Sequence, residues 1–335
     1  MTIAISGTTG ITLDGQFNSA SSMGFKNRII NGQMQIAQRA TSATITAGST
    51  IAAGYSTVDR FYVYCTGANV TAAQVAGSGA TKNRLQITGA ASVTAVGIGQ
   101  RIEQLNSYDL AGSTATLSAD LAISATLTTV TWTASYATTT ADTFGTLASP
   151  TVTQIATGTF TVTSTVTNFS TNITIPAAAT TGIQIVFTVG ALTAGLTWTI
   201  GNVQLEKGST ATSFDYRPYT TELQLCQRYF CKSYDIATVP GTVTFSGASA
   251  TATYSAAFNG NGTLNFIFPV EMRAAPTVTQ YSSINANTTG KCSSTTVDYT
   301  VNAASANTRQ AYSSGQSSGG AASQLFFQWT ASIEL

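Results

Sequence analysis

This chain contains no histidine, although it is 335 residues long. Histidine is the side chain that most often acts as a general base at neutral pH, and it is the commonest metal ligand in proteins. Its absence excludes Ser-His-Asp and Cys-His catalytic sites. Acid–base catalysis by this chain would therefore have to rely on carboxylates.

Charged residues are also scarce, at 8% of the chain against about 25% in ordinary soluble domains. The net charge is +1 and no basic stripe is present, so we expect no nucleic-acid partner. No Lys or Arg occurs between Arg101 and Lys207. We therefore expect this part of the chain to recognise neutral, hydroxyl-rich ligands more readily than anions.

Cysteine is rare, and Cys65, Cys226, Cys231 and Cys292 lack the spacing of a metal site. We predict free, buried thiols and neither a metal nor another cofactor. A disulfide would need a geometry that the sequence does not define.

Two segments bear on export and membranes. The N-terminus, residues 1–7, lacks the basic region and apolar core of a signal peptide, so export by that route is not expected. Residues 182–201 are uncharged, but Gly190, Gly195 and several threonines favour a strand–turn–strand over a membrane span. We therefore predict no membrane insertion.

Alternation of apolar residues with threonine dominates the rest of the chain. It is almost strict over residues 159–167, and it returns in Leu196-Thr-Trp-Thr-Ile200. A period of two residues indicates a strand with one buried face. Many short strands separated by Gly and Asn are typical of a sandwich or jelly roll. The predicted fold class is all-β, with a jelly-roll β-sandwich, a short helix and a second C-terminal β-sandwich.

We divide the chain into four parts: an arm at 1–26, a jelly roll at 27–222, a short helix and linker at 223–237, and a β-sandwich tip at 238–335. Residues 220–229 are the best helix candidate, and Thr221 with Gln224 fits a capping box. Phe327, Trp329, Ala331, Ile333 and Leu335 share one face of a terminal strand. We therefore expect truncation at this end to damage the fold.

Seven motifs occur in an order that resembles tail-fibre proteins of bacteriophages. They lie at residues 27–34, 38–39, 57–61, 100–103, 203–208, 211–219 and 222–230. The opening and closing strands also resemble carbohydrate-binding jelly rolls that accompany glycosidases. Beyond residue 230, Glu271-Met-Arg-Ala-Ala-Pro276 and the terminal strand are similar to fibre tips.

The resemblance implies a homotrimeric fibre of the virion, synthesised in the host cytoplasm. Its N-terminal arm would attach to a tail or baseplate protein, and its distal end would bind a polysaccharide of the host cell surface. The arm alternates apolar side chains but cannot bury a core of its own, so we expect docking through Ile3, Ile5, Ile11 and Leu13. A disordered leader is the alternative.

Four tyrosines of the C-terminal part are candidate ligand-binding residues: Tyr254, Tyr281, Tyr299 and Tyr312. Sugars are commonly bound by an aromatic ring together with amide and hydroxyl groups, and these tyrosines lie among Ser, Thr and Asn. For each one, the alternative is a half-buried ring with its hydroxyl at the rim of a sandwich.

Two charged pairs, Asp59-Arg60 and Arg101 with Glu103, are predicted to form structural ion pairs that link strands, because buried charges are normally paired. The alternative is a polar ligand-binding cluster.

The expected function is a non-enzymatic, glycan-binding phage fibre. One rival is a tailspike depolymerase, which would need two acids about 5–10 Å apart in an aromatic-lined groove. The other rival is a bacterial surface adhesin.

Overall fold

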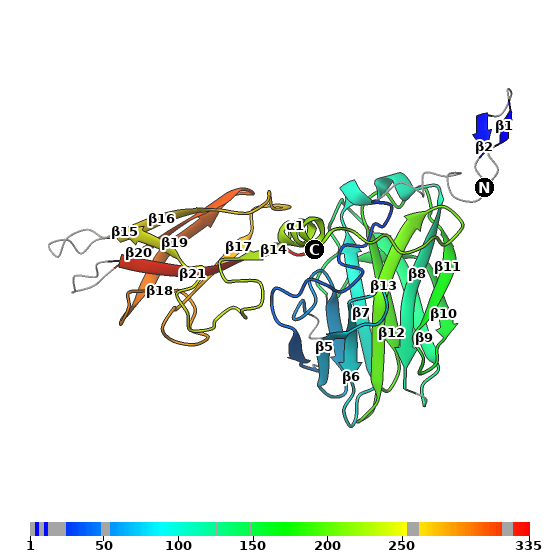
Figure 1. Cartoon of the computed structure of the whole chain (residues 1–335), viewed down its shortest axis with the longest axis horizontal. Coiled ribbons are helices and arrows are strands. Elements are labelled where there is room, and N and C mark those ends of the chain that lie inside the picture. The colour runs from blue at the N-terminus through cyan, green and yellow to red at the C-terminus, as the bar shows by residue number, and fades with distance from the viewer. Residues whose placement is uncertain are drawn as a thin grey trace.

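The computed structural model describes residues 4–6, 10–12, 25–47, 54–124, 126–147, 149–252, 261–316 and 324–335. Two β-modules follow one another along the long axis of the molecule, and the helix α1 (Tyr219–Gln227) lies where they meet (Figure 1). The predicted all-β class, with two β-modules and a short helix between them, is confirmed. We call strands β3 to β13 the jelly roll and strands β14 to β21 the C-terminal module.

The jelly roll consists of two antiparallel sheets. The five-stranded sheet has the order β10-β9-β12-β7-β4, formed by Val152–Thr161, Thr129–Ala137, Ile183–Val189, Ala95–Ile102 and Tyr62–Thr66. The six-stranded sheet has the order β11-β8-β13-β6-β5-β3, formed by Thr167–Thr174, Thr114–Ile123, Thr197–Lys207, Asn83–Thr88, Val70–Ala76 and Ser42–Ile45. The strand–turn–strand predicted at 182–201 corresponds to β12 and β13. In the described part of the chain, no helix is long and apolar enough to cross a membrane.

The core of the jelly roll lies between its two sheets. Alternate side chains of each strand point inward, and Phe187, Trp198 and Leu85 are no more than 1% exposed. One sequence prediction is wrong here, because residues 159–167 are not a single strand. They contain the end of β10, a turn and the start of β11, which are edge strands of different sheets. The alternation in the sequence continues through the turn, but the side that faces the core changes. Val162 is buried and Val166 is exposed, whereas Phe169 and Ile173 of β11 face the core.

The helix α1 starts earlier than predicted and without the predicted cap. Its N-cap residue is Pro218, no side chain caps it, and the Glu222 N–H donates to the Pro218 carbonyl at 3.0 Å. The boundary placed at 222/223 therefore falls inside the helix. Cys226 is fully buried against Ile30 and Ile36 of the jelly roll. Such a short helix needs this packing to persist.

The C-terminal module is built around the long strand β21 (Gln324–Ser332). β21 pairs with β14 (Phe230–Lys232), β15 (Ser249–Ala252), β17 (Thr277–Tyr281) and β18 (Lys291–Ser293). β18 continues the sheet to β19 (Asp298–Ala306), β20 (Gln310–Gln316) and β16 (Asn261–Ile267). Trp329 of β21 stacks on Phe266 with ring centroids 4.5 Å apart. The apolar face predicted for the terminal strand is confirmed.

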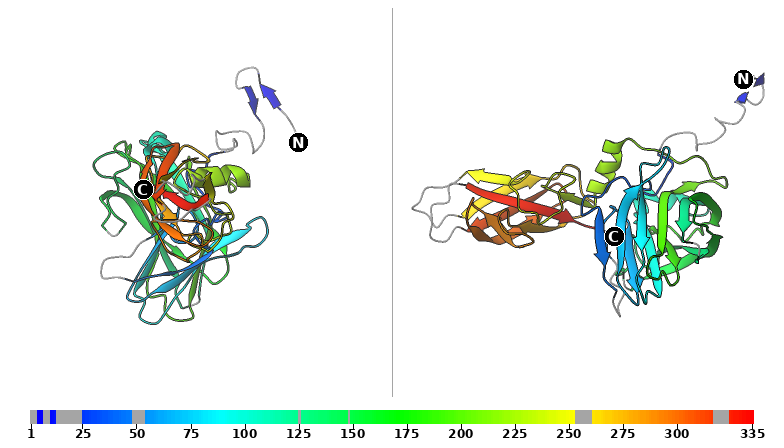
Figure 2. Two further views of the ribbon diagram at one scale, coloured as in Figure 1. Left: turned by 90° about the vertical axis from the view of Figure 1, so that its left-hand side faces the viewer. Right: turned by 60° about the horizontal axis from the view of Figure 1, so that its bottom comes forward.

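The two chain ends differ. In the arm, β1 (Ala4–Ser6) pairs with β2 (Gly10–Thr12), and Ile5 lies opposite Ile11. Ile3 and Leu13 lie outside the described residues, and attachment through the arm stays a prediction. At the other end, the residues after β21 return to the jelly roll, and the C-terminus lies beside it in two views (Figure 1, Figure 2).

Candidate functional site

The outer surface of the five-stranded sheet carries three rows of side chains that point away from the core, and we call it the tyrosine–threonine face. Strand register defines the rows, since paired residues lie side by side on the same face. Row one is Arg101, Gln184, Ser135 and Gln154; row two is Tyr62, Gly99, Val186, Thr133 and Thr157; row three is Tyr64, Gly97, Thr188, Thr131 and Thr159.

The two tyrosine rings of this face lie across glycines of the neighbouring strand β7. A β-carbon at Gly97 would lie 2.1 Å from Cζ of Tyr64, and one at Gly99 would lie 2.3 Å from Cζ of Tyr62. Neither position therefore has room for a side chain beneath the ring. Glycine alternates with larger residues in β7, so the two aromatic rings can lie directly over the backbone of this strand.

Only one of these rings is open to a ligand. Tyr62 is 3% exposed, because Tyr55 packs edge-on against it with centroids 5.8 Å apart. Tyr64 is partly exposed. Burial raises the pKa of the Tyr64 phenol above its usual range, so it remains a neutral hydroxyl donor at pH 7.

Threonines surround Tyr64. Thr188 and Thr131 are partly exposed in the same row, and Thr159 at its end is exposed. In row two, the hydroxyls of Thr133 and Thr157 lie 3.1 Å apart. Aromatic and hydroxyl groups together can bind a sugar through its C–H surface and its hydroxyls. No side chain of the three rows is acidic, so carboxylate catalysis is not available on these rows.

The four tyrosines predicted from sequence lie elsewhere. Tyr254 falls outside the described residues. Tyr299 is 8% exposed and belongs to an apolar cluster with Cys292 and Phe327, which is a core position. Tyr281 is half-buried and packs edge-on against Tyr234 at 6.3 Å.

Tyr312 is 38% exposed between its cross-strand neighbours Ser305 and Asn265. It does not join Tyr281. The side chain of Gln280 donates to Ser313 inside the module, so the adjacent residues Tyr281 and Tyr312 point away from that shared interior. Ligand binding by Tyr281 or Tyr312 stays a prediction, with each ring at a separate place.

Sequence reasoning missed Tyr62 and Tyr64. The available signal was the pair of aromatics two residues apart in Phe61-Tyr-Val-Tyr-Cys65, which puts both rings on one strand face. The matching signal was the pair of glycines in Val96-Gly-Ile-Gly-Gln100. Only the register of β4 against β7 shows that the rings and the glycines meet.

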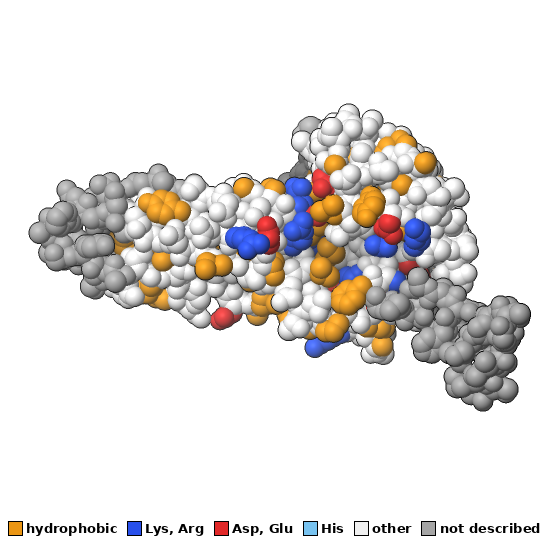
Figure 3. All heavy atoms as spheres, turned by 90° about the horizontal axis from the view of Figure 1, so that it is seen from above, with side chains coloured by type: hydrophobic (Ala, Val, Ile, Leu, Met, Phe, Trp, Pro, Cys, Tyr) orange, Lys and Arg blue, Asp and Glu red, His pale blue; other side chains and the backbone are white. Residues whose placement is uncertain are grey.

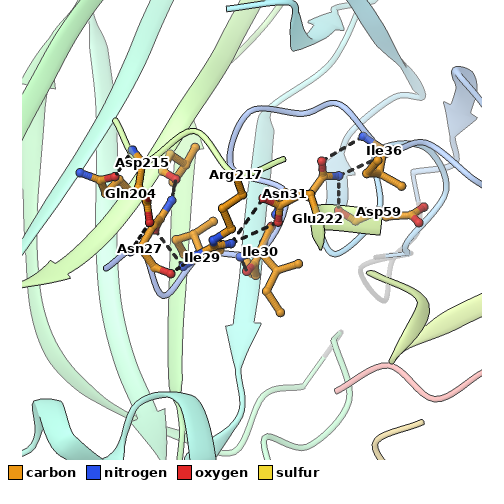
Figure 4. A network of polar contacts seen from close by, with 12 residues as sticks. Asn27, Ile29, Ile30, Asn31, Ile36, Asp59, Gln204, Asp215, Arg217 and Glu222 are labelled. Carbon is orange, nitrogen blue, oxygen red and sulfur yellow. Dashed lines mark hydrogen bonds and ion pairs between the residues drawn. The ribbon is translucent and has the colours of Figure 1, made fainter. Parts of the chain in front are cut away.

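The motifs that resemble tail fibres meet in a network of buried polar contacts at one end of the jelly roll (Figure 4). Asn27 donates to the Val203 carbonyl at 3.0 Å and accepts from the Leu205 N–H at 3.0 Å. Asn31 accepts from the Ile36 N–H at 2.9 Å and donates to the Asp59 carbonyl at 2.9 Å. These side chains satisfy backbone groups of loops, which is a structural role.

Glu222 extends this network from α1. It accepts the Asn31 N–H and forms an ion pair with Arg217 at 3.2 Å. Burial raises the pKa of the Glu222 carboxyl, against the opposite effect of Arg217. The helix is thereby tied to the first motif of the jelly roll.

Neither of the ion pairs predicted from sequence, Asp59-Arg60 or Arg101 with Glu103, is found among the salt bridges of the described residues, and three of these four residues pair with others. Glu103 pairs with Arg228 at 3.0 Å, and Arg60 pairs with Glu334. Asp59 lies 3.6 Å from Arg39, which also pairs with Glu334 at 2.9 Å. Seen from above, many of the charged side chains in view lie near the middle of the molecule, where the modules meet (Figure 3).

Among the described residues, no group of three or more His, Cys, Asp or Glu side chains could hold a metal ion. The four cysteines are free and buried, as predicted. Burial raises the pKa of Cys231 and of Cys292 to about 12, so these thiols stay protonated at neutral pH.

No protein-family model matches this sequence, and neither does any curated protein sequence. Several solved structures resemble parts of the fold. A putative sugar binding protein from Bacteroides thetaiotaomicron is 12% identical, with 54% of this chain and 100% of that chain covered and a TM-score of 0.35. A family 16 carbohydrate-binding module is 20% identical, with 41% and 84% covered and a TM-score of 0.28.

The enzymatically active domain of tailspike protein 4 from bacteriophage CBA120 is 13% identical, with a TM-score of 0.32. The similarity covers 55% of this chain but only 22% of the tailspike chain. At such low identities and TM-scores, these likenesses identify no function for this chain.

Proposed function

We propose that this chain is a non-enzymatic protein that binds a neutral cell-surface glycan on the tyrosine–threonine face. The observation that carries this proposal is the partly exposed ring of Tyr64, which lies over Gly97 with Thr188 in the same row. A sugar stacked on this ring has hydroxyl partners within its own row. The absence of acids from the three rows supports binding rather than hydrolysis.

The biological setting that we propose rests on the motif resemblance. The chain would be a homotrimeric tail fibre of a phage virion, made in the host cytoplasm and attached to the tail or baseplate through residues 1–26. A single neutral-sugar site binds weakly, because each contact replaces well-bound water. Three copies that bind simultaneously raise avidity by about 10²–10⁴. A bacterial adhesin is the alternative setting.

The test is binding of the full chain to an array of neutral oligosaccharides, followed by titration of the best binder. Tyr64→Ala is expected to weaken affinity about tenfold, which corresponds to about 1.4 kcal/mol. Tyr219→Ala is the matched control, because Tyr219 is an exposed tyrosine of α1, outside the face. Melting temperatures show whether each variant is folded.

Three outcomes separate the alternatives. If Tyr312→Ala abolishes binding while Tyr64→Ala retains it, the site lies in the C-terminal module. If no neutral glycan binds the wild-type chain, the proposed function is wrong. New reducing ends, released from a bound polysaccharide, would establish the depolymerase instead.

A further inference from the structure

Three residues of row one are buried although the fourth, Gln154, is exposed. In row one, Arg101, Gln184 and Ser135 are only 2–5% exposed, although they point away from the core. In row three, Tyr64 and Thr188 are partly exposed. Something other than the sheet must therefore cover row one.

The cover is identified by the hydrogen bonds of Arg101. Its Nη1 donates to the main-chain oxygens of Gly145 and Leu335, both at 2.9 Å. Its Nη2 donates to Thr146 at 3.2 Å and to Phe144 at 3.4 Å. Residues 144–146 and Leu335 therefore lie over row one, on the outer side of the sheet.

The fifth N–H of Arg101 is also engaged, since Nε donates to Gln184 Oε1 at 2.8 Å. A guanidinium has five N–H donors, and all five are used within the protein. Arg101 thus has no donor left for a ligand. The residues that an incoming molecule meets at this edge are Gly145 and Thr146, which are exposed and whose carbonyls accept from Arg101.

The chain end is fixed at this position by two further contacts. The Tyr55 hydroxyl donates to the Leu335 oxygen at 3.3 Å, while the Tyr55 ring packs on Tyr62 of row two. The preceding residue, Glu334, pairs with Arg39 and Arg60 of the jelly roll. The end of the C-terminal module therefore forms part of the surroundings of the face.

We propose that residues 144–146 and the chain end at Leu335 form one wall of the glycan-binding face, and that this wall selects sugars that donate hydroxyl hydrogen bonds. This inference rests on the proposed function. A strand rises about 3.4 Å per residue, so row one lies about 7 Å from row two and about 14 Å from row three. A glycan stacked on Tyr64 therefore has to extend about 14 Å along the strands to reach the wall.

The chemistry of the wall favours neutral sugars over uronates. A carbonyl oxygen has two lone pairs, and a sugar hydroxyl can donate to the one that Arg101 leaves free. A carboxylate only accepts hydrogen bonds, and at this wall it would meet other acceptors. The expected ligand class is a neutral glycan with free hydroxyls that is long enough to span from Tyr64 to the wall.

The experiment compares neutral glucose and galactose oligosaccharides with glucuronate and galacturonate oligomers of equal length, using the full chain. The wild-type chain is expected to prefer the neutral series at least about fivefold. Arg101→Lys keeps the positive charge but offers only three N–H donors. It should lower the affinity for the neutral series about fivefold and reduce the preference, since a hydrogen bond contributes about 0.5–1.5 kcal/mol.

Tyr55→Phe is the second variant, because it removes only the hydroxyl that holds Leu335. It should weaken neutral binding about twofold, and it decides the question if Arg101→Lys fails to fold. Arg309→Lys is the control, since Arg309 lies in an exposed ion pair with Glu271 in the C-terminal module.

The inference and the proposed function fail in different ways. Tyr55→Phe and folded Arg101→Lys could keep the affinity and preference of the wild type while Tyr64→Ala weakens binding. That result would contradict the proposed wall but leave the proposed glycan-binding face in place. If Tyr64→Ala binds like the wild type, or nothing binds, the proposed function fails and the inference fails with it.

Discussion

The interior of the jelly roll is one continuous apolar cluster, whereas the described residues of the C-terminal module form two small apolar clusters. Between those clusters, Gln280, Ser313 and Gln328 are buried and bonded to polar partners. In the jelly roll, the ion pairs of Arg60 and Glu103 lie at the end where the other module docks.

This difference indicates which module can keep a binding surface rigid without help from the other module. A sheet on a large apolar core keeps its outer face in place without help, because close packing resists displacement. A module with small apolar clusters depends on its internal hydrogen bonds and on docking. The tyrosine–threonine face lies on the first kind of module, and its wall depends on the docking of the second.

We expect the largest effect on stability from the contacts that dock the C-terminal module on the jelly roll. Glu334→Ala removes the carboxylate that pairs with both Arg39 and Arg60, and Arg60 is only 1% exposed. Leaving a buried charge without its partner costs about 3–5 kcal/mol. Chemical denaturation of the variant measures this loss.

The matched control is Glu271→Ala, since its pair with Arg309 is exposed and should contribute no more than about 1 kcal/mol. Equal losses for Glu334→Ala and Glu271→Ala would show that the modules do not depend on this docking.

A smaller effect is expected from the polar interior of the C-terminal module. Ser313→Ala removes the partner of the buried Gln280 side chain, and an orphaned buried donor costs about 1–3 kcal/mol. In the jelly roll, Thr138→Ala removes an exposed hydroxyl contact with Thr153 at 3.0 Å, with an expected change within about 0.5 kcal/mol. If the two variants unfold at the same denaturant concentration, the buried polar contact of the C-terminal module contributes no more than an exposed one, and its proposed role in that interior is wrong.

The smallest effect is a loss of stability in alkali. Burial raises the pKa of Tyr55 from its ordinary value of 10.0 to about 12. Between these values the unfolded chain has lost a proton that the folded chain keeps. This contribution to stability is therefore complete below about pH 10 and falls as the pH rises toward 12.

Melting temperatures from about pH 9 to pH 11 test this dependence, with Tyr55→Phe as the comparison. The variant should show a shallower decline than the wild type. Some decline should remain, because burial also raises the pKa of Tyr62 and Tyr229. Identical slopes for both proteins would exclude Tyr55 as a source.

The sheets were predictable because their side chains alternate locally, as Trp198 between Thr197 and Thr199 illustrates. The crossover at residues 162–166 was not predictable, because the alternation in the sequence continues through it without a break. The ring of Tyr64 over Gly97 and the pair of Arg60 with Glu334 depend on strand register and module docking. Those relations join segments far apart in the chain, 274 residues in the case of Arg60 and Glu334.

The sequence could not show, for the same reason, that the predicted tyrosines lie apart from one another. Tyr281 and Tyr312 share a composition typical of sugar binding, but their strands meet through Gln280 and Ser313, which turns the two rings away from each other. Local composition carries no information about which faces of two strands meet.

The most direct measurement is a crystal structure of the full chain with a bound neutral oligosaccharide. We predict a sugar ring stacked on Tyr64, with hydroxyls in hydrogen-bond contact with Thr188 or Thr131 and a more distant sugar of the same chain against residues 145–146. An oligosaccharide seated on Tyr312 or Tyr281, with the tyrosine–threonine face empty, would contradict the central claim.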